Sequence, residues 1–455
     1  MASTKISYTQ TTPTNNLKYT ISFWFKKAQP KISGTQYYMS AVVSGYANYW
    51  FIRSHNTDDN LDINNIASSG TGGRLITNRK FRDPSAWYHV VYVYDSANVT
   101  AGDRMKLYVN GVEETSFATD TNPTLNQASV PNSNSQVLDI GREDVAYFDG
   151  CMSHVQFVDG LALAPTEFGE FDSTSGIWKI KTGSYATPGN NGFHLKMEDA
   201  SNLDLDSSSN AHTFTTTGTL TATKDNPSNN FATMNPLQNY IPAHTFSNGN
   251  NTITTTNSSE TYSMSTMGLS AGKWYFEALL DASTYSIYSQ IGIAVAPGRH
   301  AGDYIGQETW AYGTGFDNTG KYRQDGLATA YGNTWTGGDY LGCYMDLDNN
   351  KVYFAINGVI QNSGTGISIT AAANTTGYGN YFFCVGDRHG DDSIWYCNFG
   401  NGYFGTTALT GTTYSDNDSI GTFKYSPNDG GASSFDSSAK NFMALCTKNI
   451  KAYGG

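Results

Sequence analysis

The sequence predicts an all-β protein: two antiparallel jelly-roll β-sandwiches in series, joined by a packed, turn-rich bridge. Two hairpin signatures lead to this prediction, because the Asn-Gly pairs at 110–111 and 357–358 are each flanked by alternating apolar residues. Asn-Gly readily supplies the two positive φ angles that a type I′ turn needs. Each pair lies downstream of a Trp-Tyr strand, at 87–91 and at 274–277. No long window has the apolar period and the capping residues that are typical of a helix.

The first sandwich is expected over residues 1–170. Alternate apolar residues at 19–25 fall on one face of a period-2 strand. Runs rich in aromatic and β-branched residues, such as 49–53 and 90–94, are bounded by polar turns. Strands at this spacing are typical of sandwich or barrel folds.

The composition changes in the bridge, residues 171–245, where turn-rich stretches such as 207–210 and 225–230 replace the long strands. A flexible linker would not carry large apolar residues, so we expect an ordered segment that packs on one or both sandwiches. The apolar residues of the bridge include Trp178, Phe193, Leu195, Phe214 and Met234.

The second sandwich is expected over residues 246–405, with its clearest strands at 291–295, 342–348 and 381–385. A C-terminal tail segment, residues 406–455, follows it. The tail is expected to be anchored by Phe423, Phe442, Met443, Leu445 and Cys446.

Charge and hydropathy restrict the partners. The chain has 455 residues with 27 Lys and Arg against 39 Asp and Glu, a formal net charge of −12. Nucleic acid and anionic membranes would repel this charge, so neither is expected as a partner. No stretch approaches the roughly 18 apolar residues needed to cross a bilayer. Residues 1–5 lead into an alternating segment and not into a signal peptide, so we expect synthesis in the cytoplasm.

Five widely spaced cysteines form no Cys-x-x-Cys pair, so neither a zinc site nor a redox motif is indicated. They are expected as buried thiols on strands, and no cofactor is expected. The five are Cys151, Cys343, Cys384, Cys397 and Cys446.

The first sandwich resembles the laminin-G/concanavalin-A-like lectin family. The strand at 21–25, the Trp-Tyr strand at 87–91, the hairpin at 107–111 and the closing strand at 148–157 occur in that family's order. The resemblance implies a lectin-type sandwich.

The second sandwich resembles a SPRY domain. The opening strand at 272–277, the strand at 291–294, the block at 342–358 and Asn398-Phe399-Gly400 with Phe404 match that family in order. The block at 342–358, which contains the second Asn-Gly pair, is the most diagnostic part.

The bridge and the tail are similar to a module of bacteriophage virion proteins, on the residues at 192–195, 204–208, 229–237 and 441–449. The whole series therefore resembles tail fibres and other surface proteins of tailed phages. This implies a non-enzymatic virion protein that acts as a homo-oligomer, in the role of tail fibre, knob or capsid decoration. Its implied partners are other virion proteins and host-surface carbohydrate. The alternative is a secreted or cell-surface carbohydrate-binding lectin-like module.

Aromatic residues in loops can stack on sugar rings, while Asn and Asp side chains bind the hydroxyls. We expect the contact surface in loops 44–60 and 305–340. The alternative for these aromatic residues is packing in the cores, the usual role of Trp in sandwiches, or in subunit contacts. The candidates are Tyr46, Tyr49, Trp50, Trp310, Tyr312, Tyr322, Tyr331 and Trp335.

Catalytic residues and metal ligands are not expected. The Glu-x-Asp-x-x-Glu strand that glycoside hydrolases of the concanavalin-A fold use is absent from the sequence. A Ser-His-Asp site around His389 would need a nucleophile that Ser393 is too near in sequence to provide. Calcium could use acidic loops, but none has an ordered ligand spacing. These loop residues are Asp58, Asp59, Asn60, Asp139, Asp149, Asp346, Asp348 and Asn349.

Overall fold

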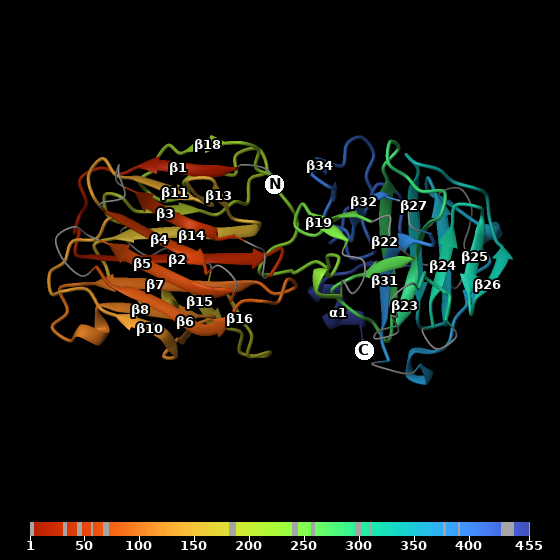
Figure 1. The fold of residues 1–455 in the computed structure, drawn as a ribbon, viewed down its shortest axis with the longest axis horizontal. Helices are drawn as coiled ribbons and strands as arrows, with labels where there is room; N and C mark the ends of the chain where they lie inside the picture. The colour runs from red at the N-terminus through yellow and green to blue at the C-terminus, as the bar shows by residue number, and fades with distance from the viewer. Residues whose placement is uncertain are drawn as a thin grey trace. The chain divides into compact units, whose positions relative to one another are not determined.

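Strands form both halves of the chain, and each half has two main sheets packed around its own core (Figure 1). The all-β, two-sandwich fold class is thus confirmed. The two compact units are Met1–Ala222 and Thr223–Gly455. The computed structural model describes residues 4–30, 34–42, 48–55, 58–66, 72–181, 188–238, 244–255, 260–295, 303–308, 312–375, 379–389, 392–428 and 441–454.

In the first unit, one sheet has eight strands in the order β10-β6-β5-β4-β3-β11-β1-β18. A short hairpin of two further strands, β12 and β13, follows β11. The strands are β1 (Lys5–Thr9), β3 (Gln36–Val42), β4 (Tyr49–Ser54), β5 (Asn60–Ile66), β6 (Arg74–Lys80), β10 (Phe117–Thr121), β11 (Val137–Ile140), β12 (Arg142–Glu143), β13 (Ala146–Tyr147) and β18 (Thr215–Thr217).

The opposing sheet has six strands in the order β17-β14-β2-β7-β8-β9. The predicted alternation holds, because the alternate residues Tyr19, Ile21, Phe23 and Phe25 lie in the core of the unit. Asn110 and Gly111 have φ angles of 49° and 79°, as the predicted I′ turn requires. The strands are β2 (Lys18–Lys27), β7 (Tyr88–Asp95), β8 (Met105–Val109), β9 (Val112–Glu113), β14 (Gly150–Asp159) and β17 (Phe193–Leu195).

The first part of the predicted bridge is built into this unit. Strand β17 pairs with β14, and β18 pairs with β1. The hairpin of β15 (Gly169–Phe171) and β16 (Trp178–Ile180) packs on the outer face of the six-stranded sheet, where Trp178 Nε1 donates to His89 Nδ1 at 2.8 Å. The Trp178 ring lies so close to Gly111 and Gly169 that a Cβ at either would be 2.4 Å away from it.

In the second unit, a nine-stranded sheet follows the order β19-β20-β32-β22-β27-β28-β29, with β30 beside β28 and β35 beside β22. Asn357 and Gly358 repeat the φ angles of the first hairpin, 49° and 79°. The strands are β19 (Thr245–Ser247), β20 (Thr252–Thr254), β22 (Lys273–Leu280), β27 (Tyr340–Asp346), β28 (Lys351–Ile356), β29 (Val359–Ile360), β30 (Ile367–Ser368), β32 (Ile394–Asn398) and β35 (Met443–Ala444).

The facing sheet has six strands in the order β21-β31-β23-β24-β25-β26, and a separate pair is formed by β33 and β34. The strands are β21 (Thr261–Met264), β23 (Ser289–Val295), β24 (Thr314–Asp317), β25 (Lys321–Gln324), β26 (Leu327–Ala330), β31 (Tyr381–Asp387), β33 (Tyr403–Phe404) and β34 (Thr407–Ala408). Within the described residues, the helical elements are η2 (Ala101–Asp103), η3 (Pro165–Glu167), η4 (Pro236–Gln238), η5 (Asn362–Gly364), η6 (Ala372–Asn374) and α1 (Thr447–Tyr453).

The rest of the bridge and the tail together cover the outer face of the nine-stranded sheet. The two segments contact each other, since Ala232 N donates to Leu445 O at 2.9 Å. Below them, the buried Glu277 carboxylate accepts hydrogen bonds from the tail amides Lys424 N and Tyr425 N. The side chains that form this second apolar layer include Phe231, Tyr275, Tyr344, Tyr353, Phe423 and Phe442. Within the described ranges, no helix has the length and apolar character to span a membrane.

Buried titratable groups predict opposite pH responses for the two units. Burial lowers the pKa of His89 and His194 to about 3, whereas it raises the pKa of Glu277 to about 7. Between pH 6.5 and 3 the unfolded first unit binds more protons than the folded one, so its stability falls with falling pH. Between pH 7 and 4.5 the folded second unit binds more protons, so its stability rises with falling pH.

From pH 7 to pH 5, we expect His89 alone to cost the first unit about 2 kcal/mol and Glu277 to add about 2–3 kcal/mol to the second. Hydrogen exchange read by mass spectrometry on the whole chain measures both units at once. Glu277→Gln should flatten the response of the second unit and leave that of the first unit unchanged. Parallel responses in the two units would contradict this assignment.

Candidate functional site

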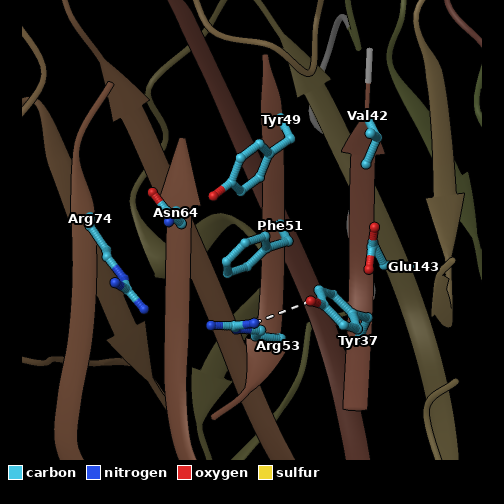
Figure 2. A pocket seen from close by; sticks show the side chains of 8 residues that line it. All are labelled: Tyr37, Val42, Tyr49, Phe51, Arg53, Asn64, Arg74 and Glu143. Atoms are coloured by element: carbon cyan, nitrogen blue, oxygen red, sulfur yellow. Dashed lines mark hydrogen bonds between the residues drawn. The ribbon is translucent and has the colours of Figure 1, made fainter. Parts of the chain in front are cut away.

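The outer face of the eight-stranded sheet carries a pocket of about 260 Å³, which spans strands β3 to β6. We call it the aromatic–arginine pocket. Figure 2 shows its lining, and Tyr49, Phe51 and Arg53 of the central strand β4 lie in the middle of it. The lining residues are Tyr37, Val42, Tyr49, Phe51, Arg53, Asn64, Arg74 and Glu143.

Strand alternation explains why these side chains share one face. Trp50 and Ile52 of β4 point into the core, and successive side chains of a strand point to opposite faces. Tyr49, Phe51 and Arg53 therefore lie together on the outer face.

The strand register brings the neighbouring residues into the same place. Phe51 pairs with Asn64 of β5, and Asn64 pairs with Arg74 of β6. On the other side, Tyr37 of β3 pairs with Arg53. The pocket thus joins residues of four consecutive strands, β3 to β6.

Aromatic rings form the floor of the pocket. The Tyr49 and Phe51 rings stack with their centroids 5.7 Å apart and an interplanar angle of 17°. The Tyr37 ring meets Phe51 edge-on at 5.5 Å, and the Arg53 guanidinium lies over Phe51 at 4.3 Å from the ring centroid. Phe51 and Tyr37 are 5% and 8% exposed, so among these rings the half-buried Tyr49 offers the most apolar surface, next to hydrogen-bonding groups.

A buried carboxylate orders the two arginines. Asp62, 0% exposed, accepts from Arg53 Nε at 2.8 Å and from Arg74 Nε and Nη2 at 2.9 Å each. Arg53 Nη1 also donates to the Tyr37 hydroxyl at 3.1 Å. Hydrogen bonding to Asp62 raises the pKa of Arg74, so this guanidinium stays cationic. Arg74 Nη1 has no partner among the residues that the structure describes.

The hairpin β12–β13 borders the pocket on the side of β3. Ser40 Oγ donates to Arg142 O at 2.7 Å, which fixes the start of the hairpin to the outer face of β3. Its Glu143 carboxylate lines the pocket and makes no hydrogen bond or ion pair with another described residue. Burial raises the pKa of the Tyr37 hydroxyl, which therefore stays protonated beside it.

Of the aromatic candidates in the first unit, the structure places Tyr49 in the pocket. Trp50 is a core residue, which corrects its assignment to a contact loop: β4 begins at Tyr49, so the next side chain points inward. Tyr46 lies outside the described residues.

The candidates of the second unit that the structure describes do not form a shared surface. Tyr331 and Trp335 are core residues, again a correction, since Trp335 packs edge-on against Trp395 with ring centroids 6.1 Å apart. Tyr312 and Tyr322 are half-buried and pack against the same core. Trp310 lies outside the described residues.

Arg53, Asp62 and Arg74 were missed as site residues. The period-2 run Tyr49, Phe51, Arg53 is visible in the sequence once Trp50 is assigned to the core. The pairing of Asp62 with Arg74 depends on the register between β5 and β6, which includes an irregularity after Asn60. No local pattern in the sequence reports that register.

Three of the acidic residues considered for calcium form ion pairs with lysines. Asp59 pairs with Lys27, Asp139 with Lys5, and Asp346 with Lys273. Across the described ranges, no group of three or more His, Cys, Asp and Glu side chains is placed to hold a metal ion.

The remaining reactive residues are held in structural contacts. Ser393 Oγ bonds to Asp387 and Ser289, whereas His389 packs on the Tyr288 ring. The cysteines are thiols and not disulfides, and four of them are buried, with Cys151 half-buried.

Loss of the Asp62 charge should destabilise the first unit. Asp62→Asn leaves two arginines facing one neutral amide, and we expect a loss of about 2–3 kcal/mol. This is less than for a fully buried pair, because Arg74 is 35% exposed. Denaturant unfolding of the whole chain measures it. The matched control is Asp58→Asn, since Asp58 is an exposed aspartate 3.5 Å from Lys80 and should change stability little. Equal effects would contradict the role of Asp62.

Comparisons with known proteins agree with the two sandwiches. Residues 2–167 match the concanavalin A-like lectin/glucanases superfamily, and residues 273–386 match the SPRY domain. Among curated proteins, the chain is 33% identical over 94 residues to the ATP-dependent RNA helicase DDX1 of Xenopus laevis. That match covers 21% of this chain and only 12% of the helicase.

Two solved structures illustrate the structural likeness. The SPRY domain of human HERC1 matches at 15% identity, covering 36% of this chain and 96% of that one, with a TM-score of 0.29. The heptameric SAP-like pentraxin of Limulus polyphemus matches at 19% identity, covering 36% of this chain and 73% of that one, with a TM-score of 0.27.

Proposed function

Because this chain carries a laminin-G/concanavalin-A-like lectin domain followed by a SPRY domain, we propose that it is a non-enzymatic glycan-binding protein. The aromatic–arginine pocket of the lectin-like domain is the proposed sugar site. The observation that carries the proposal is the stacked floor of Tyr49 and Phe51, which lies beside Asn64, Arg74 and Glu143.

The chemistry of this pocket suits a sugar. A pyranose ring has an apolar face of C–H groups that packs on a flat aromatic ring, and hydroxyls that both donate and accept hydrogen bonds. The Asn64 amide does both, the Arg74 guanidinium only donates, and an ionised Glu143 only accepts. Ligand sites commonly combine an apolar, aromatic lining with a few placed polar groups of this kind.

The carboxylates of the pocket favour binding over hydrolysis. Most glycoside hydrolases use two carboxyl groups that flank the bond to be cleaved. Here Asp62 is buried and its oxygens accept from two guanidinium groups, whereas Glu143 stands on the opposite wall. A single accessible carboxylate supports recognition of a sugar without cleavage.

For the biological setting, we propose a surface protein of a tailed-phage virion, as tail fibre, knob or capsid decoration. Support comes from the resemblance of the bridge and the tail to a module of bacteriophage virion proteins. In the second unit these two segments are joined by the hydrogen bond from Ala232 N to Leu445 O. In this role the chain is a homo-oligomer in the virion, bound to other virion proteins and able to attach to host-surface carbohydrate. The second candidate, a secreted lectin-like module, uses the same sugar site.

Tyr49→Ala should weaken glycan binding by about tenfold or more, because it removes one ring of the floor. The whole chain is screened on a glycan array, and the best ligand is then titrated by calorimetry against both proteins. Tyr285→Ala is the control, since Tyr285 is an exposed tyrosine of the second unit. Unchanged affinity in Tyr49→Ala would refute this site, and release of reducing ends from the ligand would refute the non-enzymatic role.

The virion setting is tested by antibody-gold labelling of intact particles in electron microscopy. Label at the tail supports a receptor-binding role, and label over the head supports a decoration or knob subunit. Absence of label from particles that were made in cells expressing the protein would favour the secreted lectin.

A further inference from the structure

We infer that the aromatic–arginine pocket takes an acidic sugar, whose carboxylate is held by the Arg74 guanidinium and whose ring lies on the floor of β4. This inference rests on the proposed glycan binding and specifies its ligand class. Three observations support it. Hydrogen bonds to Asp62 hold the arginine side chains in place, positive charge is exposed on their side of the pocket, and Glu143 lies on the opposite side.

Arg74 is ordered before any ligand arrives. Its Nε and Nη2 donate to the two oxygens of Asp62, at 2.9 Å each, so the plane of the guanidinium is fixed. Nη1 is left without a partner among the described residues. A guanidinium that is already oriented loses less side-chain entropy when it binds a carboxylate.

The charge that a ligand meets at this side of the pocket is positive. Arg53 and Arg74 share the single carboxylate of Asp62, which leaves one positive charge uncompensated. Their side chains are 20% and 35% exposed, whereas Asp62 is 0% exposed. A ligand therefore meets the cations and not the anion that orders them.

Arg74 also reaches the floor on which the sugar would lie. Its backbone is on β6, but its guanidinium bonds to Asp62 of β5, one strand nearer to Phe51. Neighbouring strands are about 4.8 Å apart. Asp62 pairs with Arg53 in the register of β4 and β5, so a carboxylate at the Arg53 end of the floor is about one strand spacing from the guanidinium. The Arg53 guanidinium covers the Phe51 ring, at 4.3 Å from the ring centroid.

Glu143 gives the ligand a direction. It lines the pocket beside β3, and Figure 2 shows it on the side opposite to Arg74, with Tyr49 and Phe51 between them. Three strand spacings, roughly 14 Å, separate β3 from β6. A sugar acid placed with its carboxylate toward Arg74 keeps that group away from Glu143 and turns its hydroxyls toward this acceptor.

The test compares each acidic ligand with its own neutral form. The probes are oligomers of galacturonic acid, hyaluronan and polysialic acid, each before and after chemical reduction of the carboxylates to alcohols. Calorimetry or biolayer interferometry on the whole chain gives the affinities. We expect at least one acidic form to bind about tenfold or more tightly than its reduced form, with an affinity that falls as salt is raised.

Two variants assign the effect to Arg74. Arg74→Gln should bind the acidic form as weakly as the wild type binds the reduced form, and Arg74→Lys should recover part of the difference. Arg79→Gln is the matched control, because Arg79 lies on the same strand, is 48% exposed and pairs with Glu114 instead. Comparing the acidic and reduced ligands on the wild type needs no variant, so the test survives if Arg74→Gln fails to fold.

The outcomes separate this inference from the proposed function. Equal binding of acidic and reduced forms, or tight binding of neutral glycans alone, overturns the acidic-sugar assignment and leaves glycan binding in place. An acid preference that persists in Arg74→Gln overturns the role of Arg74. No binding to these probes or to any glycan on the array overturns both.

Discussion

The structure depends on one constraint, that a β-sheet has two faces and only one of them can point into the core of a sandwich. The six-stranded sheet of the first unit covers its other face with the β15–β16 hairpin, where Trp178 bonds to the buried His89. The nine-stranded sheet of the second unit covers its other face with the tail and part of the bridge. The eight-stranded sheet differs, because its outer face carries the ordered aromatic and charged groups of the pocket.

Asp62 links the stability of the first unit to the shape of that pocket. A buried charge without partners would be very costly, and the two arginines that neutralise Asp62 are the same groups that line the pocket. The site is therefore held in place by the requirement to pair one buried anion, and its geometry does not depend on a ligand. This arrangement also restricts the sequence, since neither arginine can change without removing hydrogen bonds that the buried Asp62 carboxylate accepts.

The sequence was sufficient to predict the fold because its signals are local. Asn110-Gly111 and Asn357-Gly358 specify their turns within two residues, and the alternation from Tyr19 to Phe25 specifies a strand. The site was predicted only through Tyr49. Residues 49–53 are predicted as a strand, yet Tyr49 and Trp50 are expected on the same contact surface, although successive side chains of a strand point to opposite faces. The ion pair between Arg74 and Asp62 depends on a strand register that only the three-dimensional fold specifies.

The contact between Ala232 and Leu445 has a consequence for synthesis on the ribosome. Translation is vectorial, so all the strands of the first unit emerge before most of the second unit has been made. The second unit cannot complete its folding until residues 441–454 are available, because they supply Phe442, strand β35 and helix α1. Until then the face bearing Tyr275, Tyr344 and Tyr353 lacks that part of its cover, and the nascent chain carries its greatest risk of aggregation before residues 441–454 emerge.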